Sequence, residues 1–375
     1  MRSANQVWLS DSVAPLAASP ARARSTRPVS RLALSGAAIN VRMLFMNNPG
    51  SRDATRRTIV LAGPTASGKS ALAMAVAEAL KSSGVAVVLI NADSMQVYRE
   101  LRVLTARPGA DDEARFPHRL YGVMSAAERC TAARWRTLAL REIDAVWAGG
   151  GVPIVVGGTG LYIRALLEGI APVPDIPVAV RDAAAERYDA LGAPAFHAAL
   201  GERDPQAAAR LAVGDRQRLL RAWEVVEATG RPLSSWQDDV PEPGLDGQIF
   251  RILVAVDRDV LYRRYDTRFD VMVEAGALDE VAGLLAAGLD PELPAMKALG
   301  VAALGAHLRG EIDRDAAAEQ VRRETRNFAK RQMTWFRHQY RPDVTVSGVD
   351  PTAAIEAVTR FLLTACGSGT SFPVR

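Results

Sequence analysis

The sequence predicts an α/β protein with a doubly wound parallel sheet and an inserted helical domain. Three continuous apolar runs, Thr58–Gly63, Val85–Asp93 and Val152–Gly160, alternate with alanine-rich stretches of helical character. Such runs favour parallel strands that are buried on both faces, with helices as the connections between them. A fourth run, Phe250–Arg258, comes only after a long stretch without a strand pattern. The simplest arrangement is one α/β core that a helical segment interrupts.

Bulk composition is that of an ordinary globular protein. The 375 residues suffice for two domains, and 49% of them are hydrophobic. The two cysteines, Cys130 and Cys366, lie far apart without metal-type spacing, which favours a reducing, cytoplasmic location. No apolar run approaches the roughly 18 residues of a membrane span. The net charge of +4 does not by itself indicate nucleic acid, and nothing demands more than a monomer.

The first 57 residues differ in composition from the rest. They contain nine arginines, no lysine, two acids and four prolines that interrupt any helix. Two interpretations fit: an Arg-rich, acid-poor transit peptide, or a disordered extension that can also arise from a start codon assigned too far upstream. The second is favoured because no amphipathic helix emerges, and Met43 and Met46 are candidate later starts.

The expected domain boundaries follow these changes of pattern. The α/β core, with basic C-terminal helices, takes residues 58–170 and 236–342. The helical insertion takes residues 171–235, and begins in a proline-rich segment that favours neither helix nor strand. The last residues, 343–375, are expected to form a C-terminal tail with one helix around Ala353–Leu363.

A glycine-rich segment between the first strand and the next helix has the sequence of a phosphate-binding loop. The letters GPTASGKS fit G-x-x-x-x-G-K-[ST] in the required strand–helix context. The glycines let backbone N–H groups point inwards, and the helix N-terminus adds positive potential. Lys69 would neutralise phosphate oxygens, and the Ser70 hydroxyl would bind Mg²⁺. A di- or triphosphate site in a P-loop NTPase-like fold is therefore expected at Gly63, Pro64, Thr65, Ala66, Ser67, Gly68, Lys69 and Ser70.

The acid that usually accompanies such a loop follows an unexpected strand. Nucleotide triphosphatases and kinases usually place a carboxylate after another apolar strand to organise the metal. Here the run Val152–Gly160 ends in glycines and Thr159, whereas Asp93 ends the run Val85–Asp93. An acid at the carboxyl end of a parallel strand can hold metal-bound water or act as a base, although a helix N-cap is also open. The pattern favours small transferases over motor ATPases.

Two stretches concentrate basic residues. On one predicted helix Arg218 and Arg221 are three residues apart and share a face, with Arg216 nearby. The segment Val321–Pro342 carries seven Lys or Arg against one acid, interleaved with aromatic residues. The arginines are candidate nucleic-acid contacts or a solvated face. Aromatic rings at helical spacing are more often core than stacking platforms for bases, and this applies to Phe328, Trp335, Phe336 and Tyr340.

Taken together, these motifs resemble those of the tRNA dimethylallyltransferase family, the IPP transferases, which prenylate an adenine beside the anticodon. The resemblance spans about Thr58–Tyr340 and rests on seven motifs in order: GPTASGKS, NADSMQVYREL, LTARP, PIVVGGTGLYIRALLEG, DRQRLLRAWEV, FDVMVEAGALDEV and ETRNFAKRQMTWFR. Each motif alone is weak, whereas the ordered set is highly specific. Two departures are small, because Arg107 replaces a frequent Lys and Ser70 a frequent Thr.

The resemblance implies a reaction and a set of roles. The loop, whose pattern is shared with ATP sites, would hold dimethylallyl diphosphate, and the adenine amine would attack the allylic carbon as Mg²⁺-bound diphosphate leaves. In the catalytic set, Asp93 matches the family's aspartate, Thr159 a tRNA-contacting residue and Arg268 an arginine used on the diphosphate. The implied tRNA contacts are Asp93, Ser94, Met95, Gln96, Thr159, Arg181, Gln217, Arg218, Leu219, Leu220 and Arg221.

Three alternatives share part of this pattern. A nucleotide or small-molecule kinase would use the same loop, but it leaves the basic helix unexplained. A non-catalytic or ATP-driven RNA-binding protein would not need Asp93. An isopentenyltransferase acting on free AMP, ADP or ATP would use identical chemistry, and the long inserted and basic helices are what favour tRNA. A C-terminal zinc finger, as in some eukaryotic relatives, is excluded because the Cys/His pairs are missing.

Overall fold

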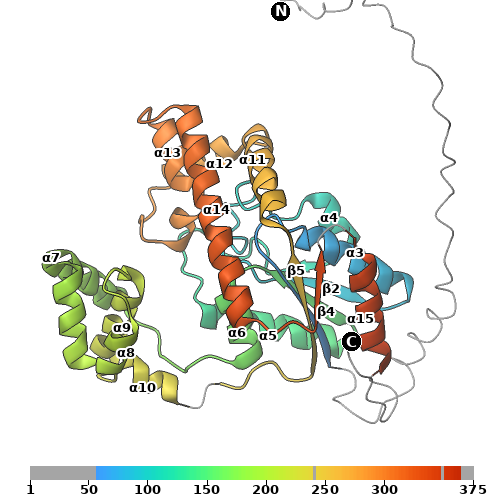
Figure 1. Ribbon diagram of the computed structural model, residues 1–375, viewed down its shortest axis with the longest axis horizontal. Helices are drawn as coiled ribbons and strands as arrows, with labels where there is room; N and C mark the ends of the chain where they lie inside the picture. Colours follow the sequence, from blue (N-terminus) through green and yellow to red (C-terminus); the bar gives the residue numbers. More distant parts are fainter. Residues whose placement is uncertain (1–55, 240–241, 348–349, 365–375) are drawn as a thin grey trace, which may run out of the picture.

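The computed structural model describes residues 56–239, 242–347 and 350–364 (Figure 1). The two interpretations of the N-terminal extension therefore concern residues that lie almost entirely outside the described ranges, as do Cys366 and the end of the chain. No helix in these ranges is long and apolar enough to cross a bilayer.

Six strands form one parallel sheet in the order β3-β2-β4-β1-β5-β6, which confirms the predicted α/β fold. The central strands β1 and β4 are buried along their whole length, which is why their sequences are continuous apolar runs. The short β3 and β6 were not predicted, since two and four residues give no recognisable pattern. The strands are β1 Arg57–Ala62, β2 Val87–Asn91, β3 His118–Arg119, β4 Val152–Gly157, β5 Gln248–Ala255 and β6 Val344–Ser347.

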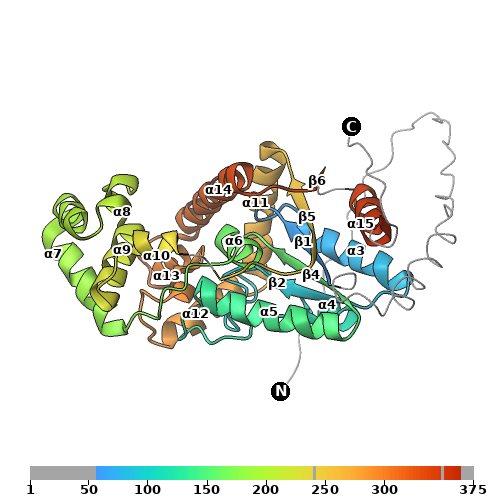
Figure 2. The same ribbon diagram turned by 90° about the horizontal axis from the view of Figure 1, so that it is seen from below.

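Helices cover both faces of the sheet, and the sheet separates two hydrophobic cores (Figure 2). The smaller core lies under α3 and α15, whereas the larger one lies under α5, α6 and the C-terminal helices. The helices of this α/β part are α3 Lys69–Ser82, α4 Ala110–Arg115, α5 Ala132–Ala148, α6 Gly160–Glu168, α11 Arg258–Glu274, α12 Ala277–Ala286, η1 Pro294–Lys297, α13 Val301–Leu308, α14 Arg314–Gln339 and α15 Thr352–Thr364.

The C-terminal residues complete the α/β core, so the expected boundary at residue 342 is wrong. Strand β6 pairs with β5, with Val344 in register with Ile252. Helix α15 packs on α3, and Phe361 stacks on Phe250 with ring centroids 5.0 Å apart. The expected helix around Ala353–Leu363 is confirmed, but it packs on the α/β core and does not form a separate tail.

Four of the five helices described between β4 and β5 form a separate unit at one end of the molecule (Figure 1). They pack around their own small core, in which Phe196, Leu200 and Leu219 are fully buried. The buried Asp204 joins two of the helices, because its carboxylate accepts hydrogen bonds from the Ser234 hydroxyl and from Ala207 N–H. The helices of this helical unit are α7 Val178–Arg203, α8 Pro205–Arg210, α9 Arg216–Thr229 and α10 Leu233–Asp238.

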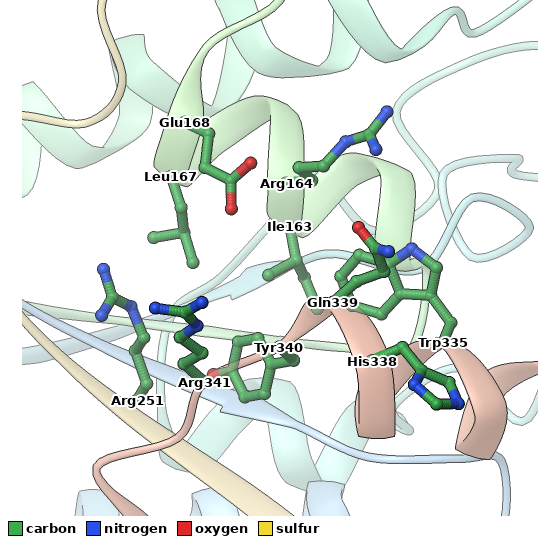
Figure 3. Close-up of a pocket in the computed structure, with 10 residues that line it drawn as sticks. All are labelled: Ile163, Arg164, Leu167, Glu168, Arg251, Trp335, His338, Gln339, Tyr340 and Arg341. Carbon is green, nitrogen blue, oxygen red and sulfur yellow. The ribbon is translucent and has the colours of Figure 1, made fainter.

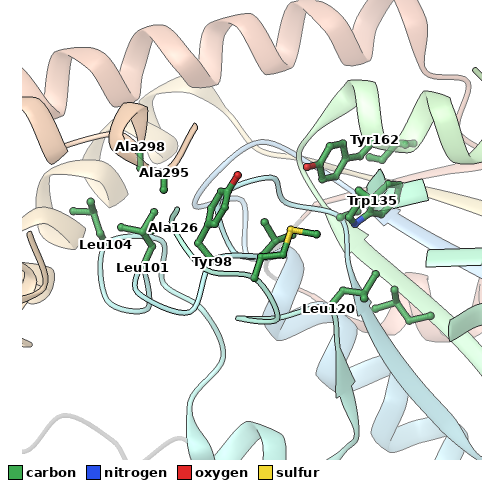
Figure 4. Packing of buried hydrophobic residues seen from close by; sticks show 14 of the residues in the cluster. Tyr98, Leu101, Leu104, Leu120, Ala126, Trp135, Tyr162, Ala295 and Ala298 are labelled. Atoms are coloured by element: carbon green, nitrogen blue, oxygen red, sulfur yellow. The ribbon is translucent and has the colours of Figure 1, made fainter. Parts of the chain in front are cut away.

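The loop that follows β2 is packed and hydrogen-bonded along its length (Figure 4). Tyr98 and Leu101 are fully buried beside alanines of the C-terminal segment. The Glu280 carboxylate of α12 accepts hydrogen bonds from three successive N–H groups, those of residues 102, 103 and 104, at 2.7–2.9 Å. Charged acceptors make stronger hydrogen bonds than neutral ones. The loop is thus a fixed platform beside the carboxyl ends of the strands.

Candidate active site

The phosphate loop joins β1 to α3 at the carboxyl edge of the sheet. Ala66 and Gly68 have positive φ angles of 55° and 89°, which curl the backbone before the helix begins. A side chain at Gly63 would come within 3.0 Å of the Val254 carbonyl, so β5 packs closely against the loop. Helix α3 has no side-chain cap and no acid in its first turn. Its N-terminal N–H groups are therefore suited to an anion.

Lys69 lies half-buried at the start of α3, with Nζ 3.3 Å from the Pro64 carbonyl. Burial lowers its pKa to about 8, the Asp93 carboxylate raises it in part, and the Arg268 guanidinium lowers it further. Burial also lowers the pKa of Arg268, again opposed by Asp93. The structure therefore brings three of the sequence-predicted residues, Lys69, Asp93 and Arg268, into one electrostatic environment.

One face of α11 holds the loop from the side. The guanidinium of Arg268 donates to Thr65 Oγ1 at 3.3 Å, and Arg264 donates to the Ala66 carbonyl at 3.0 Å. Tyr265 points its hydroxyl at the Thr65 carbonyl at 3.4 Å, and burial raises its pKa to about 12. Only Arg268 was predicted from the sequence. The four-residue spacing of Arg264 and Arg268 on a helix was the available signal for the other contacts.

Asp93 follows the last residue of β2 by two positions and is held by a local turn. Buried Asn91 accepts from Asp93 N–H at 2.8 Å and donates to the Leu120 carbonyl at 3.1 Å. Asp93 Oδ1 accepts from Met95 N–H at 3.0 Å, whereas Oδ2 accepts no hydrogen bond from any described residue. Burial raises the pKa of nearby Tyr121, and the Asp93 charge raises it further. One carboxylate oxygen is thus anchored and the other is available.

Thr159 connects the ends of β2 and β4. Its hydroxyl oxygen accepts from Ser94 N–H at 2.9 Å and donates to the Ser94 hydroxyl at 3.3 Å. The two strand ends approach so closely that a side chain at Gly157 would come within 2.1 Å of the Ala92 carbonyl. The residues predicted after β2 and β4 therefore meet at one place, as expected for parallel strands. Gln96 turns away from them, and its amide donates to the Thr105 carbonyl at 2.9 Å.

Helix α14 closes the remaining side, through a glutamine that sequence reasoning missed. Gln332 is buried; its Oε1 accepts from Thr65 N–H at 2.9 Å, and its Nε2 donates to the Gly158 carbonyl at 2.8 Å. Trp335 packs against Gly160, where a side chain would come within 2.3 Å of the ring. The only signal for Gln332 was an uncharged polar residue within a basic helix.

The aromatic residues of α14, and Tyr340 directly after it, largely serve packing. Phe336 and Tyr340 are buried in the large core, which confirms the core interpretation for these two. Trp335 and Phe328 are half-buried, and only Trp335 packs against that core. Lys330, like the other cations on the outer face of the helix, is exposed.

The second group of predicted residues lies on the helical unit and not at the sheet edge. Arg218 is 75% exposed and pairs with Asp215 at 3.4 Å, and Arg221 lies 3.8 Å from Glu224. Burial lowers the pKa of Arg221, Glu224 opposes the shift, and Arg181 adds to it, so Arg181 and Arg221 are neighbours. Gln217 is exposed and Leu220 half-buried.

Leu219 requires a correction. Its side chain is fully buried in the core of the helical unit, where it packs in the cluster that contains Phe196 and Trp223. A side chain in that position offers no surface to RNA. The sequence placed Leu219 in the contact set only because it lies between flanking motif residues.

Metal ligands are sparse in this region. Within the described ranges, no group of three or more His, Cys, Asp or Glu side chains could hold a metal ion. Oxygen donors are nevertheless present, because the exposed Ser70 follows Lys69 on α3 and Asp93 has one available oxygen. Mg²⁺ commonly binds in this way, through one or two protein oxygens and the phosphates of a substrate. The residues present therefore fit a substrate-borne ion and not an all-protein metal site.

Comparisons with known proteins agree with this geometry. A tRNA dimethylallyltransferase from Rhodospirillum centenum is 55% identical over 289 residues, 76% of this chain and 90% of the relative. One from Bradyrhizobium is 54% identical over 284 residues, with 92% of its length covered.

Solved structures give the same answer. A tRNA isopentenylpyrophosphate transferase from Bacillus halodurans is 29% identical with a TM-score of 0.57, over 83% of this chain and 97% of that one. A eukaryotic dimethylallyltransferase acting on tRNA, 23% identical with a TM-score of 0.66 over 81% and 78% of the two chains, supports the fold. A sequence model described as IPP transferase matches residues 96–339, so the chain belongs to the IPP transferase family.

Proposed function

We propose that this protein transfers a dimethylallyl group from dimethylallyl diphosphate to the exocyclic N6 amine of the adenine 3′-adjacent to the anticodon in tRNA. The observation that carries the proposal is the convergence of Lys69, Arg268 and Asp93 around a phosphate loop. Two cations and free N–H groups suit a diphosphate, whereas the carboxylate suits an amine. An anion-binding loop with one available carboxylate supports group transfer to a nitrogen nucleophile.

On the donor side, the protein stabilises the charge of the leaving group. As the bond between the allylic carbon and oxygen breaks, the diphosphate departs with the bonding electrons. Lys69 and Arg268 both contact the loop, which supports a role for them, together with loop N–H groups, in binding the leaving diphosphate. Preorganised donors of this kind stabilise a transition state without reorganisation. Mg²⁺, bound through Ser70 and the diphosphate, would supply additional charge neutralisation.

On the acceptor side, Asp93 is the proposed base. The adenine amine forms a bond to the allylic carbon and must lose a proton, which passes to the available Oδ2 of Asp93. Thr159 and Ser94, which bond to each other beside Asp93, would orient the base. The adenine must leave its stack to reach Asp93, as in other enzymes that modify bases.

The tRNA itself would extend from the sheet edge to the helical unit. Gln217, Arg218, Leu220 and Arg221 on α9, with Arg181 on α7, are the proposed contacts there. Ser94, Met95 and Gln96 would contact the anticodon loop at the sheet edge. A monomeric, cytoplasmic enzyme remains the prediction.

The test is transfer of labelled dimethylallyl from its diphosphate to unmodified tRNA, with Mg²⁺ present or chelated. AMP serves as the parallel acceptor. We expect label in tRNA only when Mg²⁺ is present without a chelator and the tRNA carries an adenine beside the anticodon. Label in AMP alone would keep the chemistry and change the acceptor. ATP hydrolysis without transfer would assign the loop to a kinase or an ATPase.

A further inference from the structure

A cavity outside the candidate active site lies between α6, α14 and β5 (Figure 3). Its volume is about 320 Å³, which is near the lower end for small-ligand sites. Ile163 and Tyr340, both buried, contribute an apolar floor, and Leu167 and Trp335 contribute walls. None of these residues belongs to the predicted phosphate or tRNA sites. Trp335 also packs on Gly160, the residue after Thr159.

The charge around this cavity is predominantly positive. Arg164, Arg251 and Arg341 line it, against the single carboxylate of Glu168. In Figure 3 the guanidinium groups of Arg251 and Arg341 lie on the same side of the cavity, below Leu167. Glu168 extends into the cavity from α6, and Arg164 points away from its centre.

Neither Arg251 nor Arg341 has a side-chain hydrogen bond or ion pair with any described residue. The neighbouring carboxylate of Asp343 accepts from Arg251 N–H at 2.7 Å and is thereby bound to backbone. Arg136 provides the contrast, since its guanidinium donates to Glu242 and to two carbonyls. Two guanidinium groups that line one cavity favour an anion there, and their planar donor sets match phosphate oxygens.

The floor of the cavity adds a second requirement. The Tyr340 ring is fixed because its hydroxyl donates to the Val60 carbonyl at 3.2 Å. It lies with Ile163 beneath the cavity, and both side chains are buried, whereas the Trp335 ring that lines the same cavity is half-buried and offers an aromatic surface to a ligand. A ligand that fits both features carries a phosphate next to a flat apolar group. A nucleotide has this composition, because its base can stack on an aromatic side chain.

The position of the cavity relates it to the candidate active site. Helix α6 begins directly after Thr159, and its far end lines the cavity. Nine residues of helix span about 13 Å. Trp335 contacts the first residue of α6 and also lines the cavity, so the two sites share one wall.

We propose that this cavity binds a nucleotide unit, with its phosphate at Arg251 and Arg341 and its base against the Trp335 ring. The unit is either part of the RNA strand whose adenine occupies the active site or a free nucleotide. In the RNA case the proposal rests on the proposed function.

The test compares wild type with Arg251→Ala/Arg341→Ala, and with Arg115→Ala/Arg141→Ala as a charge-matched control on exposed arginines of α4 and α5. Binding of unmodified tRNA is measured over a range of salt concentrations, and binding of AMP is measured by calorimetry. For an RNA unit, the cavity variant should bind tRNA roughly three- to tenfold more weakly, with a salt slope reduced by about 0.7. For a free nucleotide, AMP binding should disappear in the cavity variant and persist in the control.

Arg341→Ala is also tested alone, because Arg341 lies outside β5 and its loss should not disturb the sheet. Arg251→Lys/Arg341→Lys keeps both charges and tests whether the planar donor geometry of arginine is needed. The lysine pair should recover the salt slope but only part of the affinity, because ammonium groups lack the planar donor pair. If tRNA and AMP binding are unchanged in the cavity variant, the proposal is overturned even though prenyl transfer by the wild type continues. If the wild type transfers no prenyl group but AMP binding still requires the two arginines, the cavity site stands and the proposed function fails.

Discussion

The sheet edge and the helical unit both present positive charge, but they hold it differently. At the sheet edge, burial lowers the pKa values of Lys69 and Arg268, and backbone and hydroxyl contacts fix both side chains. On the helical unit, Arg218 is 75% exposed and, among the described residues, forms an ion pair only with Asp215 on its own segment. Exposed pairs of that kind contribute about 0–1 kcal/mol to stability.

This difference separates two ways of using charge. Fixed, partly desolvated groups can stabilise charge that develops at one point in a transition state. Exposed arginines act through many weak contacts and are screened by salt. The sheet edge is therefore suited to chemistry, and the helical unit to holding a large polyanion. Substitutions in the first region should change turnover or donor affinity, whereas those in the second should change RNA affinity.

The largest effect is expected from Asp93→Asn. The amide cannot accept the proton from the adenine amine, so transfer should slow by roughly 10²–10⁴-fold. Binding of tRNA should change little, because the local turn needs only an acceptor oxygen for Met95 N–H. Single-turnover rates and tRNA affinity, measured on the same preparation, check this. An unaltered rate would remove Asp93 as the base.

The next effect concerns the pH dependence of donor capture. With a pKa of about 8, Lys69 is charged below pH 8 and becomes neutral above it. For the donor, kcat/KM should therefore fall above pH 8, by up to about tenfold per pH unit. Lys69→Arg keeps its charge throughout and should flatten the profile in that range. A profile that falls equally in both proteins would assign the titration to another group.

The sequence predicted those parts of the site that depend on short motifs. The loop, Asp93, Thr159 and Arg268 come from separate segments, yet each carries a local pattern, and the parallel sheet brings their strand ends together. The contributions of Asn91 and Gln332 could not be predicted. Their function is to satisfy buried backbone groups, and that need exists only after the chain has folded.

The same limit applies to the edges of the fold and to the helical unit. Strand β6 has only four residues, and its pairing with β5 is a long-range contact that no local pattern reveals. Leu219 was included among RNA contacts although it faces inwards. Helical periodicity alone identifies two faces of α9, but the packing of α7 against it determines which face is buried.

A smaller effect is expected from Gln332→Met, which keeps volume but removes both hydrogen bonds. The part-buried Thr65 N–H and the buried Gly158 carbonyl would lose their partner, which costs about 1–3 kcal/mol for the buried carbonyl and less for the N–H. The melting temperature should fall by about 2–4 °C per kcal/mol, and the KM for the donor should rise as the loop loosens. Gln320→Met, on the same helix, should leave both values unchanged. A lower melting temperature with an unaltered donor KM would restrict Gln332 to a stabilising role.

The smallest effect on turnover is expected from Arg218→Ala/Arg221→Ala. These residues lie on the helical unit, so the KM for dimethylallyl diphosphate should not change, whereas tRNA should bind roughly three- to tenfold more weakly. The slope of log affinity against log salt should also decrease, by about 0.7–0.9 for each phosphate that the variant no longer neutralises. The Arg115→Ala/Arg141→Ala protein controls for the change in net charge. An unchanged slope would mean that the arginines of α9 are only solvated and do not contact RNA. Both the chemistry and RNA binding would then belong to the α/β core.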